Sequence, residues 1–211
     1  KILRDKAIML RVRNPKQITT AIPNSKELPM NKVVVKWGLD EVLSLRSLNI
    51  NAPSPITKRY SWPGQYTPFD HQKDTASFMT LNKKSFCFNE QGTGKTASAI
   101  WAADYLMTQG KVKRVLVVCP LSIMDSAWRN DLFSFAMHRT VDVAHGSKQK
   151  RKKIINSGAE FVIINYDGVE VVRDEIAAGG FDLFIVDEAT HYKNAQTKRW
   201  KTLNKLIKED D

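Results

Sequence analysis

A glycine-rich segment that ends in a lysine and a threonine contains the residue types best suited to phosphate chemistry. It reads Asn-Glu-Gln-Gly-Thr-Gly-Lys-Thr over residues 89–96. The two glycines let backbone N–H groups curl around a phosphate without a Cβ clash. The lysine would reach the β- and γ-phosphates of a nucleotide, and the last threonine would bind Mg²⁺. The residues predicted to bind ATP and Mg²⁺ are Gly92, Thr93, Gly94, Lys95 and Thr96.

The surroundings of this segment favour a phosphate loop. An apolar strand is expected over Ser85–Asn89 and a helix over Thr96–Thr108, which is the context such a loop requires. The strict pattern has glycine where this chain has Asn89. The alternative is a flexible turn between a strand and a helix that contains Gly-Lys-Thr by chance.

Two adjacent carboxylates form a second candidate site at the end of an apolar run. Residues 181–188 read Phe-Asp-Leu-Phe-Ile-Val-Asp-Glu. Asp187 is suited to Mg²⁺, directly or through a water, and Glu188 to polarising an attacking water. Taken alone, the pair is better explained as an ordinary transition from strand to loop. With a phosphate loop upstream, a catalytic site containing Lys95, Asp187 and Glu188 becomes the stronger interpretation.

The elements that must position these residues alternate between short apolar strands and stretches compatible with helix. Strands that are apolar on both faces and are separated by helices predict an α/β fold, a parallel sheet with helices on both faces. The expected strands are Ser85–Asn89, Arg114–Cys119, Val141–His145, Glu160–Asn165 and Phe181–Asp187.

Residues 1–60 lack this alternation of buried strands and helices, and their pattern predicts a small α+β unit. Strands are expected over Ala7–Val12 and Lys32–Trp37, and a helix over Gly38–Leu48. The proline-containing stretch Asn51–Gly64 is expected to be a linker without regular helix. The predicted domains are therefore 1–60, with a linker to about residue 65, and 66–211.

The charge of the chain is unusual and unevenly distributed. The 211 residues carry 33 Lys and Arg against 22 Asp and Glu, a net charge of +11. Residues 1–60 carry 12 against 4, a net of +8, so most of the excess lies there. Such a surplus indicates a polyanionic partner, nucleic acid or an anionic membrane surface. A basic run at residues 148–153 is best explained as a solvated helix start.

Composition excludes other classes of protein. The apolar runs are too short to span a bilayer. The two cysteines, Cys87 and Cys119, lie in apolar segments, which excludes a disulfide scaffold and favours an intracellular, reducing compartment. The four histidines share no metal-binding spacing.

The two motifs resemble Walker A and Walker B of superfamily 2 helicases and translocases, in their SNF2-like form. Residues 68–72 resemble the adenine-reading motif, with Gln72 as its glutamine. Residues 187–194, Asp-Glu-Ala-Thr-His-Tyr-Lys-Asn, resemble the SNF2 form of the DEAH box. Further segments that resemble this group in the same order are 117–122, 145–147 and 162–167.

The resemblance implies that residues 66–211 form the first of two RecA-like lobes of an ATP-dependent DNA translocase or helicase. Such a lobe would hold ATP–Mg²⁺ and grip the backbone of nucleic acid, by analogy double-stranded DNA. The residues that match the nucleic-acid motifs are Ser122, Asn165, Tyr166, Lys193 and Asn194.

Two departures from the family pattern qualify this expectation. Thr190 stands where the family usually has histidine, which puts the coupling of hydrolysis to motion in doubt. The sequence ends at Asp211, before a second lobe with arginine fingers. Because such fingers supply on the order of a thousandfold in comparable hydrolases, the resemblance implies poor ATP turnover by this portion alone.

Alternative functions stay open from sequence. One is a non-catalytic nucleic-acid-binding module with a vestigial nucleotide fold, and another is an annealing or fork-remodelling helicase. Residues 1–60 match no motif of the family, and their excess charge suggests an accessory module that binds DNA or a partner.

Some side chains have a structural explanation. Trp128 is expected to pack on the sheet and Cys119 to be a small buried residue. Ser122 is expected to cap a helix, with Asp125 completing a capping box. Four aromatic residues could form a wall for adenine or pack a linker on the lobe: Tyr60, Trp62, Tyr66 and Phe69.

Overall fold

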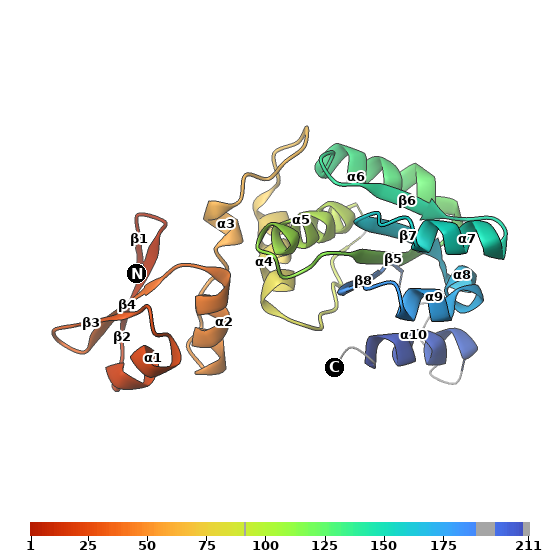
Figure 1. The fold of residues 1–211 in the computed structure, drawn as a ribbon. Helices are drawn as coiled ribbons and strands as arrows, with labels where there is room; N and C mark the ends of the chain where they lie inside the picture. Colours follow the sequence, from red (N-terminus) through yellow and green to blue (C-terminus); the bar gives the residue numbers. More distant parts are fainter. Residues whose placement is uncertain (91, 189–196, 209–211) are drawn as a thin grey trace. The chain divides into compact units, whose positions relative to one another are not determined.

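A computed structural model describes residues 1–90, 92–188 and 197–208. The chain forms two compact units. The first contains residues 1–61 and 68–90, and the second contains residues 62–67 and the chain from 91 onward. Figure 1 shows the elements of both units in sequence colours. Residues 68–90 fall within the predicted domain 66–211, but by their contacts they belong to the first unit.

The first unit is built on a four-stranded antiparallel sheet with the order β1-β2-β4-β3. The strands β2 and β4 confirm the two strands predicted from sequence. The sequence analysis missed β1 and β3, because two or three residues carry no readable alternation. The strands are β1 (Ile2–Leu3), β2 (Ala7–Arg11), β3 (Lys26–Leu28) and β4 (Lys32–Lys36).

Helices cover one face of this sheet. Asn14 caps α1 by accepting a hydrogen bond from the backbone N–H of Gln17, and Pro15 occupies the first turn, where its missing N–H costs nothing. The predicted helix after β4 is confirmed as α2. The helices are α1 (Pro15–Ala21), α2 (Leu39–Ser47), α3 (Ile56–Arg59) and α4 (Asp70–Leu81). The core between the sheet, α1 and α2 includes Ile8, Ile18, Val33, Val35, Trp37, Val42 and Leu45.

The prediction of a linker without helix over Asn51–Gly64 is wrong. The segment contains α3, and both Ser54 and Ile56 are fully buried. The Ser54 hydroxyl bonds to that of Thr80 on α4 at 2.8 Å. Prolines did not prevent this helix because Pro55 lies at its N-cap, where a helix needs no N–H donor.

Replacing Ile56 with alanine tests whether this segment is part of the core. We expect Ile56→Ala to lower the free energy of unfolding by about 2–5 kcal/mol, because it leaves a cavity at a fully buried position. Leu43→Ala on α2 removes the same number of carbons from a side chain that is 37% exposed, and should cost less than about 1 kcal/mol. Urea unfolding measures both. Equal losses would mean that residues 51–64 are not packed.

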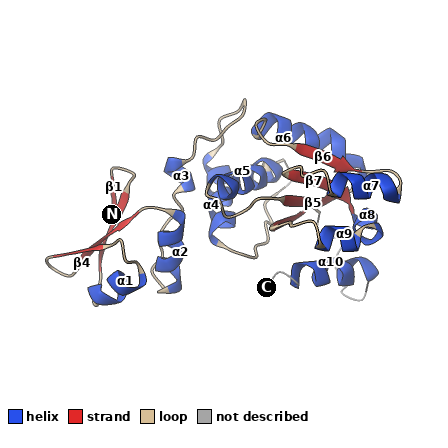
Figure 2. Cartoon of the chain, in the orientation of Figure 1, coloured by secondary structure: helices blue, strands red, loops and turns tan. Residues whose placement is uncertain are grey.

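The second unit is an α/β fold with a parallel sheet in the order β6-β7-β5-β8. Figure 2 shows its strands enclosed by helices. The central strands β5 and β7 are buried at every position, as the apolar runs predicted. The strands are β5 (Val115–Cys119), β6 (Val141–Ala144), β7 (Phe161–Asn165) and β8 (Leu183–Val186).

Helices pack on both faces of this sheet, which confirms the predicted RecA-like α/β architecture. Val115, Val117 and Cys119 of β5 point to one core, and Leu116 and Val118 to the other. The first face is covered by α5 (Lys95–Thr108), the π-helix η2 (Met124–Arg129) and α6 (Asn130–Phe135). The second face is covered by α7 (Lys148–Ile155), α8 (Tyr166–Val171), α9 (Arg173–Ala177) and α10 (Lys198–Lys208).

The prediction of a strand over Ser85–Asn89 is wrong. None of the described strands includes these residues, and Phe86 and Phe88 are 73% and 90% exposed. The apolar pattern indicated burial, but a strand also needs a neighbouring backbone to pair with. None of the described strands pairs with this segment.

The described helices are short. The longest, α5, has 14 residues. No helix within residues 1–90, 92–188 and 197–208 is both long enough and apolar enough to cross a membrane.

Candidate functional site

The glycine-rich segment leads directly into α5, and its two glycines have left-handed backbone conformations. Gly94 is the N-cap of α5 and has φ +74° and ψ +37°, a left-handed conformation. Gly92 has φ +76°, and a Cβ at that position would meet no atom within 4 Å. Both positions therefore favour glycine for its backbone conformation. The helix begins at Lys95, one residue before the predicted start, so Lys95 and Thr96 lie in its first turn, where helix N–H groups favour anions.

The start of α5 lies towards the carboxyl edge of the parallel sheet. Residues 109–114 are a short connection from the end of α5 to the start of β5, and α5 packs on one face of the sheet. Its other end therefore points towards the ends of β5, β7 and β8, as Figure 1 shows. Ligands of open α/β folds bind outside this edge.

The predicted acidic pair stands at the end of β8. Val186 pairs with Val118 of β5, and the Asp187 N–H donates to the Val118 carbonyl at 2.9 Å. The Asp187 carboxylate is held at both oxygens. Oδ2 accepts a bond from Nε1 of Trp128 at 2.8 Å, and Oδ1 accepts one from the Glu188 N–H at 2.9 Å.

The backbone turns sharply at the next residue. Glu188 has φ +49°, which a non-glycine residue adopts only at a cost of about 1–3 kcal/mol. The hydroxyl of Tyr166, from the start of α8, donates to the Asp187 carbonyl and also lies 3.3 Å from the Glu188 carbonyl. Tyr166 thus supports the turn. Its side chain is buried, and the predicted contact of Tyr166 with nucleic acid stays a prediction.

Asn165 ends β7 and is held by a buried arginine. Its Oδ1 accepts a bond from Nη1 of Arg151 at 2.9 Å, and the same Nη1 donates to the Ala144 carbonyl at 2.6 Å. Burial lowers the pKa of the Arg151 guanidinium, and the charge of Asp167 opposes that shift. A Cβ on Gly168 would clash with both Arg151 Nη1 and Asn165 Oδ1. The basic run was predicted to be a solvated helix start, and at Arg151 that prediction is wrong.

Ser122 lies exposed on a short 3-10 helix, η1 (Leu121–Ile123). The prediction that Ser122 caps a helix is wrong, because the N-cap is Pro120 and no side chain caps it. Asp125, the proposed partner in a capping box, instead forms an exposed pair with Arg129 at 3.4 Å. The exposed hydroxyl of Ser122 is thus not needed as a cap.

Gln72, the residue predicted to read adenine, stabilises the start of a helix. Gln72 lies in the first turn of α4, and its Oε1 accepts a bond from the Phe69 N–H at 2.9 Å, which stabilises the helix start. Its role in reading adenine stays a prediction. Thr190, Lys193 and Asn194 lie outside the described residues.

The aromatic residues of the connecting segment pack on the second unit. The rings of Trp62 and Trp101 meet edge to face at 5.6 Å, and Tyr66 lies 6.0 Å from Phe135. Nε1 of Trp101 donates to the Pro63 carbonyl at 2.9 Å. These contacts support the packing interpretation for Trp62 and Tyr66 over an adenine wall.

Two buried residues behave as the sequence predicted. Trp128 is 1% exposed and packs in the core beneath α5 and α6. Cys119 is fully buried, and burial, together with the smaller effect of the charges of Asp187 and Glu188, raises the pKa of its thiol to about 12. The bond from Trp128 to Asp187 was missed. The available signal was the rule that a buried indole N–H needs an acceptor.

The raised thiol pKa makes Cys119 inert in the folded protein. At pH 8 we expect iodoacetamide to leave Cys119 unmodified until guanidinium unfolds the chain, as measured by mass spectrometry. Because the unfolded thiol loses its proton near its ordinary pKa of 9.0, the free energy of unfolding falls as pH rises from 9 towards 12. Cys119→Ala should remove a slope of about 1.4 kcal/mol per pH unit in that window. An unchanged slope would refute the shift.

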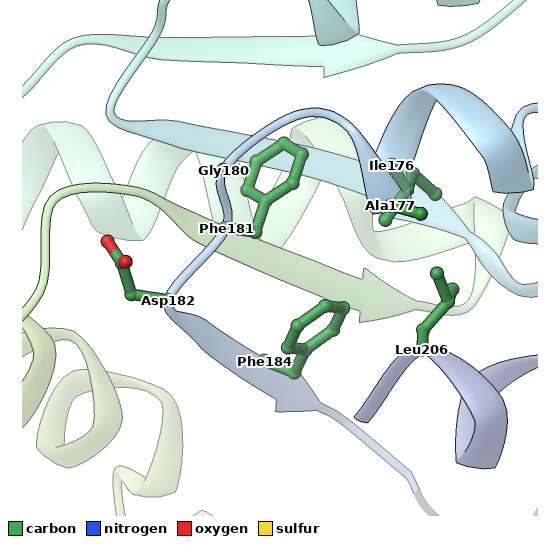
Figure 3. A pocket seen from close by; sticks show the side chains of 7 residues that line it. All are labelled: Ile176, Ala177, Gly180, Phe181, Asp182, Phe184 and Leu206. Carbon is green, nitrogen blue, oxygen red and sulfur yellow. The ribbon is translucent and has the colours of Figure 1, made fainter. Parts of the chain in front are cut away.

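A cavity of about 320 Å³ in the second unit lies away from these residues. Figure 3 shows it between α9, β8 and α10. Asp182 and Phe184 place it at the amino end of β8, opposite Asp187. The Asp182 carboxylate already accepts bonds from the N–H groups of Lys113 and Arg114, at 2.7 and 3.1 Å. The lining residues are Ile176, Ala177, Gly180, Phe181, Asp182, Phe184 and Leu206.

Asp187 and Thr96 have the oxygen groups that a nucleotide-bound magnesium ion takes from a protein, and their role as its ligands stays a prediction. Among the described residues, no group of three His, Cys, Asp or Glu side chains could hold a metal ion. Mg²⁺ in nucleotide sites uses few protein ligands and takes the rest from phosphates and water. One carboxylate, Asp187, and one hydroxyl, Thr96, match that requirement.

Comparison with known proteins places the chain in a family. Residues 71–210 match the family model of the SNF2-related domain. The chain is 26% identical over 148 residues to YqhH of Bacillus subtilis, which is described as an ATP-dependent helicase. The match covers 68% of this chain and 25% of YqhH. The chain is also 30% identical over 209 residues to the ATP-dependent helicase fft2 of Schizosaccharomyces pombe. That match covers 84% of this chain and 16% of fft2.

A solved structure gives the same answer for the fold. The SWI2/SNF2 ATPase core of Sulfolobus solfataricus in complex with dsDNA superimposes with a TM-score of 0.58 at 26% identity. The match covers 67% of this chain and 30% of that one. The chain belongs to the SNF2-related domain family, a group with ATP-dependent helicases among its relatives. It spans about a quarter of the length of YqhH.

Proposed function

We propose that the chain is the ATP-binding portion of an SNF2-like DNA translocase or helicase. The observation that carries the proposal is the left-handed Gly94 immediately before Lys95 and Thr96 at the start of a 14-residue helix. This arrangement presents backbone N–H groups and a lysine to one anion. A bound ATP would have its phosphates at the edge of the sheet where Asp187 and Glu188 stand.

The residues would divide the chemistry of ATP hydrolysis among them. Bound Mg²⁺ would neutralise charge that develops on the phosphates. Lys95 would hold the β- and γ-phosphates, while Thr96 and Asp187 would hold the ion. Glu188 would orient the attacking water and take its proton.

Nucleic acid would bind along the same edge. Ser122 is exposed, and Asn165 is fixed by its bond to Arg151, which leaves its NH₂ group as the donor for a phosphate. Lys193 and Asn194 would add contacts. The SWI2/SNF2 core of Sulfolobus solfataricus was solved with dsDNA, which supports duplex DNA as the partner. Contacts to the backbone are independent of sequence and sensitive to salt.

Full turnover would need a second RecA-like lobe, because arginine fingers contribute much of the transition-state stabilisation in comparable hydrolases. We therefore expect weak ATP binding and slow hydrolysis from these 211 residues alone. A non-catalytic module with a vestigial nucleotide fold is the alternative, favoured by Thr190. Annealing or fork remodelling is a further alternative within the enzyme class.

Substitution of Lys95 tests the nucleotide site. We expect Lys95→Ala to weaken binding of a non-hydrolysable ATP analogue by at least about tenfold, because a charge-assisted hydrogen bond contributes roughly 1.5–3 kcal/mol. Isothermal titration calorimetry with Mg²⁺ present measures the affinity. Lys153→Ala, which removes an exposed lysine from α7, is the control and should bind as the unaltered chain does. Equal affinity of all three proteins would remove the site assignment.

The N-terminal sheet is proposed as an accessory surface for the nucleic-acid backbone. In the register Arg11↔Lys32, Ala7↔Lys36 and Lys26↔Val34, the basic residues share the face opposite buried Ile8, Val33 and Val35. The described strand residues of that face include no carboxylate. Lys36 approaches Glu41 of α2 at 3.8 Å, so three cations are available for phosphates: Arg11, Lys26 and Lys32.

A charge-matched pair of variants tests this surface. Replacing Arg11, Lys26 and Lys32 with glutamine should weaken duplex DNA binding and flatten its dependence on salt. The slope of log affinity against log salt should become less steep by about 2–3, since each phosphate contact contributes roughly 0.9.

The control changes the same charge elsewhere in the first unit. Replacing Arg13, Lys16 and Lys58, which are exposed and lie outside the sheet, should leave most of the affinity and slope in place. Fluorescence anisotropy at several salt concentrations gives both quantities. Equal losses in the two variants would mean that only net charge matters and that the sheet face is not the surface.

A further inference from the structure

The indole of Trp128 is a buried donor that is directed at the acidic pair. Its side chain is 1% exposed and packs against the first face of the sheet. Its Nε1 donates to Asp187 Oδ2 at 2.8 Å. A buried N–H without an acceptor would cost about 1–3 kcal/mol, so the bond satisfies the indole N–H of Trp128. The same bond also acts on the Asp187 carboxylate.

The bond removes the rotational freedom of the Asp187 carboxylate. The terminal torsion of aspartate is broad, so a carboxylate with one donor can swing around it. Here Trp128 holds Oδ2 from the core while the backbone N–H of Glu188 holds Oδ1 at 2.9 Å. A carboxylate has about four lone-pair directions. Two are used, and the remaining two are fixed in direction.

We propose that Trp128 is a positioning residue for the magnesium site, and this inference rests on the proposed function. Its indole N–H would fix Asp187, and the two unused lone pairs of the carboxylate would be the ones offered to Mg²⁺ or its waters. Donors behind a metal-binding carboxylate typically change metal affinity by about 10–100-fold when removed. Trp128 itself touches neither the ion nor the nucleotide.

The local backbone shows how Trp128 reaches this place. It is the fifth residue of η2, a six-residue π-helix that follows η1 directly. A π-turn is wider than an α-turn and is common at functional sites. Trp128 therefore reaches Asp187 from within such a turn.

The test compares magnesium-dependent and magnesium-free binding of ADP. Trp128→Phe keeps the aromatic ring and removes the N–H. In the full 211-residue chain we expect ADP affinity in EDTA to be unchanged. The Mg²⁺ concentration that half-maximally enhances ADP binding should rise about tenfold. Isothermal titration calorimetry measures both without using tryptophan fluorescence.

Trp37→Phe is the matched control. Trp37 is fully buried in the first unit, and its Nε1 donates to the Pro53 carbonyl at 2.9 Å. This variant loses a comparable buried indole bond but should keep the Mg²⁺ dependence of the unaltered chain. If Trp128→Phe also keeps it, or if both variants shift equally, Trp128 only packs the core and the proposal is overturned. If the unaltered chain binds no ADP, the proposed function fails instead.

A second measurement covers the case in which Trp128→Phe does not fold. The chain has five tryptophans, so an indole-labelled sample should give five N–H resonances. Asp187→Asn keeps the shape of the acceptor and removes its charge. We expect one indole resonance to move strongly in this variant, and the same resonance to move when Mg²⁺–ADP binds the unaltered chain. Movement with Asp187→Asn but none with Mg²⁺–ADP, in a chain that binds the nucleotide, would overturn the proposal.

Discussion

The pairing of β5 with both of its neighbours is the constraint on which the candidate site depends. Its register aligns Cys119 with Asn165 on one side and Val118 with Val186 on the other. Because the strands are parallel, segments distant in the chain end at one edge. A one-residue slip of β8 would move Asp187 to the opposite face of the sheet, where Trp128 could not reach it. The apolar cores on both faces therefore fix the position of the acidic pair.

An arginine joins chain segments at the amino end of the parallel sheet by hydrogen bonds. Arg114 donates to the carbonyls of Ala159, Gly179 and Ile155, and its guanidinium lies 4.3 Å from the ring centroid of Phe181. Burial lowers the pKa of Arg114, and the charge of Asp182 opposes that shift. Arg114 thus organises the amino end of the sheet, away from the predicted chemistry.

The parts of the fold that the sequence predicted are those set by local patterns. Continuous apolar runs predicted the buried strands β5 and β7. The glycines before α5 predicted a turn that needs a left-handed residue, and Gly94 has that conformation. The failures share a different cause. Ser85–Asn89 is apolar without a paired strand, and residues 51–64 are rich in proline yet packed, because Pro55 takes a position where helices accept it.

The candidate site was predictable in its residue types but not in its support. Lys95, Asp187 and Glu188 could be named from their neighbours in sequence. The bonds from Trp128, Tyr166 and Arg151 join residues separated by 14 to 59 positions, and no spacing rule announces them. Ser122 was assigned a capping role from a four-residue pattern, but Pro120 had already fixed the start of the helix.

Gly168 shows how the arrangement at the carboxyl edge restricts change in the sequence. Position 168 lies in the helix α8, where alanine would ordinarily be preferred by about 1 kcal/mol. Any side chain there would displace the guanidinium that holds Asn165. A residue larger than glycine at 168 would therefore need Arg151, Asn165 and Ile164 all to shift, because a Cβ there lies closer than 3.0 Å to an atom of each. Contacts among two helices and a strand thus restrict which residue can stand at position 168.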